Sequence, residues 1–124
     1  MLLLTTTGRR TGRKRTTPVL YVKDGNRLAI VASNGGRDQS PSWWTNLRFN
    51  PLGEVQIKGE RWPVKAERAR DLEKSRLWPL LAKMYPAYDD YQRKTRREIP
   101  VVILTSSKDP ALRLAGTRQR QNVL

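Results

Sequence analysis

The sequence contains neither cysteine nor histidine among its 124 residues, and these two absences exclude several kinds of chemistry. Without cysteine there is no disulfide framework, and without either residue there is no thiolate or imidazole metal site. Ser-His and Cys-His nucleophiles and histidine acid–base catalysis are excluded as well. A magnesium site built from carboxylates alone is disfavoured, because only 11 acidic residues accompany 25 basic ones.

Long apolar stretches are also missing. The longest, Met1–Leu4 and Ile99–Leu104, are far shorter than the roughly 20 residues that span a bilayer. Met1–Leu4 lacks the basic segment and the long apolar segment of a secretory signal. We therefore expect a cytoplasmic protein, and peripheral attachment to the inner face of the plasma membrane stays open.

Basic residues dominate the charge and give a formal net charge of +14. Such an excess predicts attraction to a polyanion, which includes nucleic acid, an anionic membrane surface and a phosphorylated or carboxylated small molecule. The densest basic cluster is Arg9–Arg15, which holds four arginines and one lysine within seven positions.

Hydrophobic periodicity and turn residues predict one β-rich domain over residues 1–105, followed by a basic, flexible tail over residues 106–124. Asp24–Asn26 is the strongest hairpin signal, and Gly59–Glu60 marks a second hairpin. Helices are expected over residues 41–49, 71–84 and 86–97. The expected strands are Leu2–Thr6, Thr16–Lys23, Arg27–Ser33, Glu54–Lys58, Trp62–Ala66 and Ile99–Thr105.

Two prolines modify this pattern. Pro63 indicates that its strand is an edge strand or carries a bulge, because proline cannot donate to a β-ladder. Pro79, after Trp78, predicts a kink or a break in the long helix. Six short strands with few helices predict a β-rich α+β fold, a small antiparallel barrel whose openings are covered by helices.

The first candidate site is Thr5–Pro18, which combines hydroxyl groups, two turn glycines and several guanidinium groups. Arginine binds phosphate or carboxylate bidentately, and a glycine turn exposes backbone N–H groups. A solvated basic loop explains the spacing equally well. The glycines match neither a P-loop nor a dinucleotide fingerprint.

The second candidate site is Ser33–Gly36 followed by Pro41–Leu47. Its two glycines would let a ligand ring lie against the backbone, and the helix N-terminus would favour an anionic oxygen. Trp43 and Trp44 are neighbours on this helix, so we expect one in the core and the other in a groove. Two tryptophans on a helix more often pack in the hydrophobic core than line a cofactor site.

The third candidate site is Tyr85, Tyr88 and Tyr91, whose spacing places neighbouring members on one side of a helix. Phenols there can line an apolar cavity and still offer hydroxyls as hydrogen-bond or proton donors. Packing at a barrel mouth with hydrated hydroxyls explains the same spacing.

Six stretches in order connect these sites: LLLTTTGRRTG with RTTPVLYVKDG, VASNGG, PSWWTNLRFNP, VQIKGE, MYPAYDDYQ and REIPVVILT. Together they cover nearly all of residues 2–105 and resemble the deazaflavin (coenzyme F420)-dependent nitroreductases and quinone reductases of actinobacteria. The resemblance implies a split β-barrel, of the FMN-binding split-barrel type with two or three covering helices, that binds reduced F420 in a groove. The implied reaction is hydride transfer to a quinone, a nitro compound or an activated alkene.

The resemblance also implies roles for individual residues. Ser33, Tyr85, Tyr88 and Tyr91 would surround the substrate, and we expect a tyrosine or serine hydroxyl to stabilise or protonate the developing anion. No metal is implied. The coenzyme would contact Arg9, Arg10, Thr11, Arg15, Pro18, Asn34, Gly35, Gly36, Trp43, Asn46 and Leu47.

The chain departs from the family pattern in two ways. Asn34 stands where relatives often carry lysine, so we expect one contact to the phosphate to be weaker. Arg13 and Lys14 would compensate for this loss. The chain also begins at its first strand, whereas relatives have an N-terminal helical segment.

Two other readings stay open: a nucleic-acid-binding basic module and a split barrel that binds FMN or haem. The expected partner is a small electron acceptor and no specific nucleic acid.

Overall fold

The computed structural model describes residues 1–106, which form one antiparallel sheet of seven strands in the order β2-β1-β5-β6-β7-β4-β3. Ser106, the first residue of the expected basic tail, still belongs to the last strand, and the rest of that tail, residues 107–124, lies outside the described residues. The helices are the short 3-10 helix η1 (Asn34–Gly36) and α1 (Ser42–Phe49), α2 (Asp71–Met84) and α3 (Ala87–Lys94). The strands are β1 (Leu2–Thr7), β2 (Lys14–Val19), β3 (Val22–Asp24), β4 (Arg27–Val31), β5 (Leu52–Ile57), β6 (Glu60–Arg68) and β7 (Val101–Ser106).

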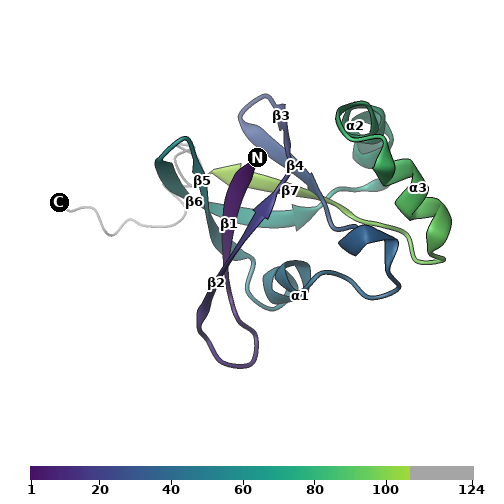
Figure 1. Ribbon diagram of the computed structural model, residues 1–124. Coiled ribbons are helices and arrows are strands. Elements are labelled where there is room, and N and C mark those ends of the chain that lie inside the picture. The colour runs from purple at the N-terminus through teal and green to yellow at the C-terminus, as the bar shows by residue number, and fades with distance from the viewer. Residues whose placement is uncertain (107–124) are drawn as a thin grey trace.

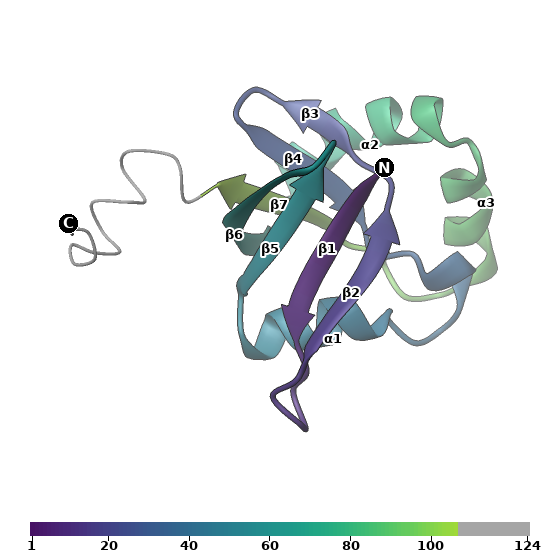
Figure 2. The same cartoon turned by 60° about the vertical axis from the view of Figure 1, so that its left-hand side comes forward.

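The connection between β2 and β3 forces the sheet to curl. These two strands lie at opposite ends of the strand order, yet only Leu20 and Tyr21 separate them in the chain. A link this short spans about 10 Å, so the two edges of the sheet must lie close together. Figures 1 and 2 show the curled sheet, with α1 across one end and α2 and α3 beside β3 and β4. The expected antiparallel split barrel is therefore confirmed.

The same connection corrects one expected strand. Thr16–Lys23 is not continuous, because β2 pairs with β1 whereas β3 pairs with β4. Residues with strand character on both sides of Leu20–Tyr21 hid the crossing from one sheet edge to the other.

Strands β4 and β7 are buried on both faces, which explains their continuous apolar sequence. One face of each strand lies inside the barrel and the other packs beneath α2 and α3. Strand alternation separates the two sets of side chains. Inside the barrel lie Leu28, Ile30, Val102 and Leu104, and beneath the helices lie Ala29, Val31, Val101 and Ile103.

Both expected hairpins form. In the β3–β4 hairpin Asp24 pairs with Arg27 and Gly25 has φ 62°. In the β5–β6 hairpin Lys58 and Gly59 both have positive φ, as the two central residues of a type I′ turn require. The turn therefore lies one residue earlier than expected.

The expected edge strand or bulge at Pro63 is wrong. β6 is an interior strand, and Pro63 lies in unbroken register opposite Glu54 of β5. Pairing of β6 with β7 begins only at Val64. Within residues 1–106 Pro63 therefore has no strand partner on its second side, and its missing N–H removes no ladder bond there.

The helix does not break at Pro79, because α2 continues from Asp71 to Met84, and the kink, the other form of this expectation, stays a prediction. Pro79 and Ser75 are exposed, so the Ser75 carbonyl that loses its helical partner remains open to water.

The third helix is shorter than expected and ends at Lys94. Within residues 1–106 no helix combines the length and apolar character that crossing a bilayer requires.

An ion-pair cluster fastens the β3–β4 hairpin to α2. Arg27 Nη2 lies 2.5 Å from Asp24 Oδ2 and 2.7 Å from Glu73 Oε2. Arg76 donates to both Asp24 oxygens, at 3.0 and 2.9 Å. The hydrogen bonds from Arg76, followed by those from Arg27, lower the pKa of Asp24 below its usual range.

Replacing Asp24 by Asn should lower the free energy of unfolding by about 1 kcal/mol at neutral pH, the upper end for solvent-screened ion pairs. Because the folded-state pKa is lowered, this stabilisation is complete above about pH 4 and disappears as the pH falls through the folded pKa. Urea unfolding of both proteins across pH 2–8 measures it. Asp90→Asn, which removes an exposed pair with Arg93, is the control. A difference that grows toward low pH would contradict the assignment.

Candidate functional site

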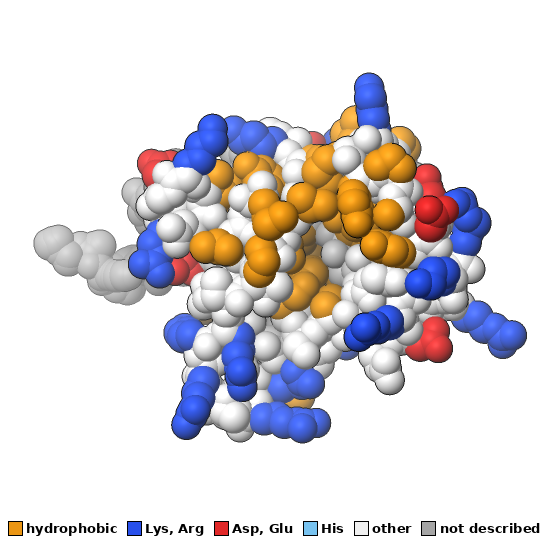
Figure 3. Space-filling model, in the orientation of Figure 1, with side chains coloured by type: hydrophobic (Ala, Val, Ile, Leu, Met, Phe, Trp, Pro, Cys, Tyr) orange, Lys and Arg blue, Asp and Glu red, His pale blue; other side chains and the backbone are white. Residues whose placement is uncertain are grey.

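A continuous groove follows the opening of the barrel and has two parts. The first part, about 530 Å³, lies between the β1–β2 loop and α1. The second part, about 680 Å³, lies between the end of β2, the loop after β4 and the tyrosines. Thr17, Ser42 and Trp43 line both parts, which makes them one groove. In Figure 3 apolar side chains surround a hollow on this face, and basic side chains gather below it, where the β1–β2 loop lies.

The basic loop between β1 and β2 is closed by its own backbone. Gly8 N–H donates to the Arg13 carbonyl and Gly12 N–H to the Gly8 carbonyl, both at 2.8 Å. Gly12 has φ 73°, which favours glycine. Arg10 and Arg15 are exposed and line the groove together with Arg9 and Thr11.

Asn46 of α1 fastens this loop to the barrel. Its Oδ1 accepts hydrogen bonds from Arg9 N–H at 3.2 Å and from Arg9 Nη1 at 2.9 Å. Its Nδ2 donates to Thr6 Oγ1 at 3.2 Å, and the Asn46 side chain is buried. Both ends of the amide are therefore used within the protein. Asn46 holds Arg9 in place, and Arg10 and Arg15 have no such partner among residues 1–106.

Strand alternation separates Arg15 from its neighbour Lys14. Lys14 Nζ lies 3.4 Å from Thr7 Oγ1, in a hollow on the outer face of the sheet that shares only Thr16 with the first part of the groove. Neither Arg13 nor Lys14 lines the groove. The expected compensation for Asn34 by these two residues therefore finds no support in their positions. Thr16, Thr17 and Ser42, which lie within the first two candidate sites but were not among the expected coenzyme contacts, line it instead.

Trp43 and Trp44 differ less in burial than expected for one residue in the core and the other in a groove. Trp43 is 8% exposed and Trp44 5% exposed, because α1 closes the barrel end and packs a wide arc of its surface against the core. Trp43 still lines the groove, as expected for one of the pair. Leu47 is fully in the core and does not line the groove.

The loop after β4 adopts successive left-handed conformations. Asn34, Gly35 and Gly36 have φ values of 48°, 65° and 81°. Ser33, Asn34 and Gly35 line the groove, and Asn34 Nδ2 donates to the Gln39 carbonyl at 3.0 Å. Gly36 is buried under α3: a Cβ atom there would lie 2.9 Å from both Tyr91 Cα and Tyr91 O. Gly36 therefore lets α3 approach, and it does not face the groove.

Tyr85, Tyr88 and Tyr91 come together in the second part of the groove, where Pro18 also lies. Tyr85 Oη and Tyr91 Oη are 3.3 Å apart, and this hydrogen bond raises the pKa of Tyr85. Tyr88 lies edge-on to Tyr85 with ring centroids 5.0 Å apart. Burial raises the pKa of Tyr88 to about 12, and its hydroxyl has no hydrogen-bond partner among residues 1–106.

Known proteins resemble this chain in sequence and in fold. The family model described as F420H(2)-dependent quinone reductase matches residues 1–106. An F420H(2)-dependent quinone reductase of Mycobacterium tuberculosis is 42% identical over 107 residues, which covers 84% of this chain and 72% of the relative. A solved F420-H2 dependent reductase superposes with a TM-score of 0.76 at 39% identity, covering 83% of this chain and 91% of that one.

More distant structures share the architecture alone. The heme storage protein HutZ of Vibrio cholerae superposes with a TM-score of 0.64 at 15% identity, covering 85% of this chain and 80% of that protein. The likeness at this identity establishes the split-barrel fold and carries no statement about ligands.

Replacing Gly36 by Ala should lower the free energy of unfolding by about 2–3 kcal/mol, because the new Cβ forces α3 outward from a left-handed backbone position. Gly35→Ala is the matched control: its φ of 65° is similar, but a Cβ there meets no atom within 4 Å. The control should lose only about 1 kcal/mol. Chemical denaturation compares the two, and equal losses would contradict the close packing of α3 on Gly36.

Proposed function

The chain belongs to the F420H(2)-dependent quinone reductase family, and from that membership we propose that it reduces quinones with electrons from reduced coenzyme F420. The observation that carries the proposal is the two-part groove. One part is lined by arginines and hydroxyl groups, and the other by tyrosines and Trp43. A ligand with an anionic tail and a flat ring matches this division.

The residues present fit such a coenzyme, which joins a deazaflavin ring to a phosphodiester and an oligoglutamate tail. Arg10 and Arg15 offer guanidinium groups that bind phosphate or carboxylate bidentately. Among the described residues that line either part of the groove, none is Asp or Glu. A polyanion therefore meets no like charge along the groove.

In this proposal Arg10 and Arg15 bind the tail, and Asn46 keeps Arg9 and the rest of the loop in position. Trp43 and the exposed backbone of Gly35 support the ring, beside Ser33 and Pro18. Reduced F420, when bound, supplies a hydride equivalent. The protein orients the acceptor next to it and excludes water with the tyrosines.

Tyr88 is the group that we assign to the developing oxygen anion of the acceptor. Its high pKa keeps the phenol protonated at neutral pH, so it acts as a hydrogen-bond donor rather than as a readily ionised acid. Tyr85 and Tyr91, whose hydroxyls already bond to each other, and the Ser33 hydroxyl complete the polar part of this cavity. Nitro compounds and activated alkenes carry an oxygen or activating group suited to the same donors, and we propose them as further acceptors.

Replacing Arg15 by Ala should raise the dissociation constant for F420 about tenfold, the effect of losing one charge-assisted contact to an anion. The wild-type affinity should fall as salt increases, and the variant should show a shallower salt dependence. Deazaflavin fluorescence titration at several salt concentrations measures both. Arg61→Ala, which removes an arginine on the outer face, should bind as the wild type does. Equal weakening by both variants would argue for a diffuse charge effect.

Replacing Tyr88 by Phe should lower kcat for quinone reduction about 100-fold and leave the F420 dissociation constant within about twofold, because only the donor to the acceptor is removed. Stopped-flow oxidation of reduced F420 measures the rate. Tyr21→Phe, which removes a hydroxyl outside the groove, should leave kcat unchanged. An unchanged kcat in Tyr88→Phe would overturn the role assigned to this hydroxyl.

A further inference from the structure

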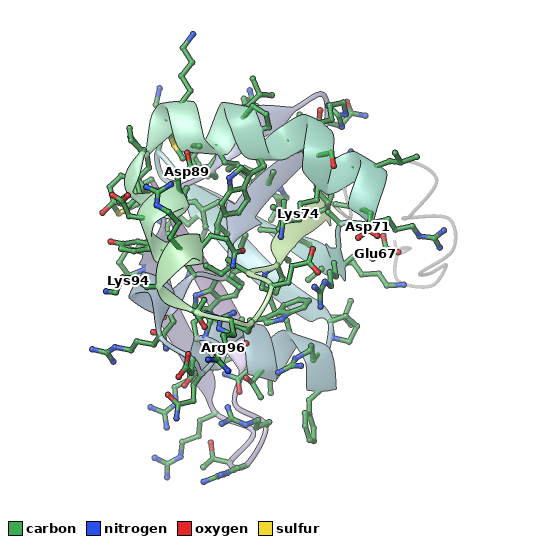
Figure 4. All side chains as sticks on the ribbon, turned by 90° about the vertical axis from the view of Figure 1, so that its right-hand side faces the viewer. Glu67, Asp71, Lys74, Asp89, Lys94 and Arg96 are labelled. Atoms are coloured by element: carbon green, nitrogen blue, oxygen red, sulfur yellow. The ribbon has the colours of Figure 1, made fainter. Side chains whose placement is uncertain are left out.

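Arg97 lies beyond the end of α3 and reaches back to the loop after β4. Its Nη2 donates to the Ser33 carbonyl at 2.8 Å and to the Ala32 carbonyl at 3.2 Å, and its Nε donates to the Arg37 carbonyl at 2.8 Å. Three backbone acceptors of one short loop thus share a single guanidinium. Its neighbour Arg96, labelled in Figure 4, makes no hydrogen bond or ion pair within residues 1–106.

The charged side chain of Arg97 binds this loop and forms no salt bridge within residues 1–106. No carboxylate lies within ion-pairing distance of Arg97 in the described part of the chain. Burial lowers the pKa of Arg97, but from a value so high that the group stays protonated at neutral pH. Its charge is stabilised by the carbonyl dipoles of the loop and, beyond ion-pairing distance, by the Asp38 carboxylate, which raises the pKa of Arg97 against the larger effect of burial.

These bonds also fix the direction of the loop's N–H groups. The two polar groups of a planar peptide unit point in opposite directions. Because the Ala32 and Ser33 carbonyls face Arg97, the N–H groups of Ser33 and Asn34 point away from it. Ser33 is right-handed (φ −82°, ψ −35°) and Asn34 left-handed (φ 48°), a sequence of conformations that gathers N–H groups into an anion-binding concavity.

Other contacts connect the same loop to the tyrosine helix. Gly36 packs against the backbone of Tyr91, and Thr95 Oγ1 donates to Asp38 Oδ1 at 2.8 Å. Thr95 is buried, and α3 and η1 lie side by side. The loop that lines the groove and the helix α3, which carries Tyr88 and Tyr91, are therefore held as one unit, with Arg97 bonded to three carbonyls of the loop.

We propose that Arg97 is a positioning residue, which holds the Ser33–Arg37 loop against the tyrosine helix and turns the N–H groups of Ser33 and Asn34 toward an anionic part of the ligand. The identity of that ligand as F420 rests on the proposed function. The effect of Arg97 on the loop does not, because it is a property of the protein without ligand.

Hydrogen exchange of the ligand-free full chain tests the positioning. In Arg97→Met the amides of Gly36 and Arg37 should exchange at least about tenfold faster than in the wild type, while amides of β5 and β6 keep their rates. Arg97→Lys keeps the charge but cannot reach three carbonyls at once, so it should lie between the two. Arg96→Met makes the same change of charge one residue away and should exchange as the wild type does.

Titration with F420 then tests the consequence for binding. Arg97→Met should raise the dissociation constant about tenfold, Arg97→Lys should restore part of the affinity, and Arg96→Met should match the wild type. Faster exchange throughout the sheet, or an unchanged dissociation constant in folded Arg97→Met, would overturn the proposal. If Arg97→Met does not fold, the same two measurements on Arg97→Lys decide.

Failure of the proposed function has a separate signature. A wild-type protein that does not bind F420 would refute the assigned ligand, while the exchange rates of the ligand-free variants would still establish or refute the role of Arg97 in the loop.

Discussion

The two-residue link between β2 and β3 is the constraint on which the rest of the structure depends. Because Leu20 and Tyr21 join the two outermost strands, the sheet cannot stay open and must curl until its edges meet. Curling buries both faces of β4 and β7. It also leaves one end of the barrel open, which α1 covers in part. The basic loop after β1, the glycine loop after β4 and the three tyrosines at and after the end of α2 all lie along that opening. Residues more than 70 positions apart in the sequence thus form one groove.

The distribution of charge follows from the same arrangement. Asp24 and Glu73 are paired with arginines between the hairpin and α2, and Glu98 lies near Lys74 and Arg68 on another side. The groove keeps its arginines without acidic neighbours. Part of the net charge of +14 therefore forms a local positive field, where Arg9, Arg10 and Arg15 line the groove and an anionic tail would lie. Because the chain has neither cysteine nor histidine, its redox chemistry depends on a bound coenzyme, and the positive groove would bind the anionic part of that coenzyme.

Much of the fold was predictable from local sequence, because turns and alternation are local signals. Both hairpins, the α1 and α2 segments and the apolar β7 followed from glycine positions and periodicity. The division of the second expected strand, the tolerance of Pro63 and Pro79 and the burial of Trp43 together with Trp44 depend on which neighbours the folded chain supplies. No local pattern contains that information.

The candidate site was predictable to a similar extent. The three residue clusters that the sequence indicated do meet at one groove, although Leu47 and Gly36 serve packing and Arg9 is held by Asn46. Arg97 carried no sequence signal, because an arginine among Arg93, Lys94 and Arg96 looks like one more solvated charge. Its role depends on carbonyl directions some 60 residues away in the chain, at Ala32, Ser33 and Arg37.

A crystal structure of the full chain with F420 tests the central claim most directly, since that claim assigns one ligand two ends of one groove. The account predicts the deazaflavin ring beside Trp43, Ser33 and the tyrosines, with the tail along Arg10 and Arg15. A ring bound at the arginine end, or a coenzyme bound outside this groove, would contradict it.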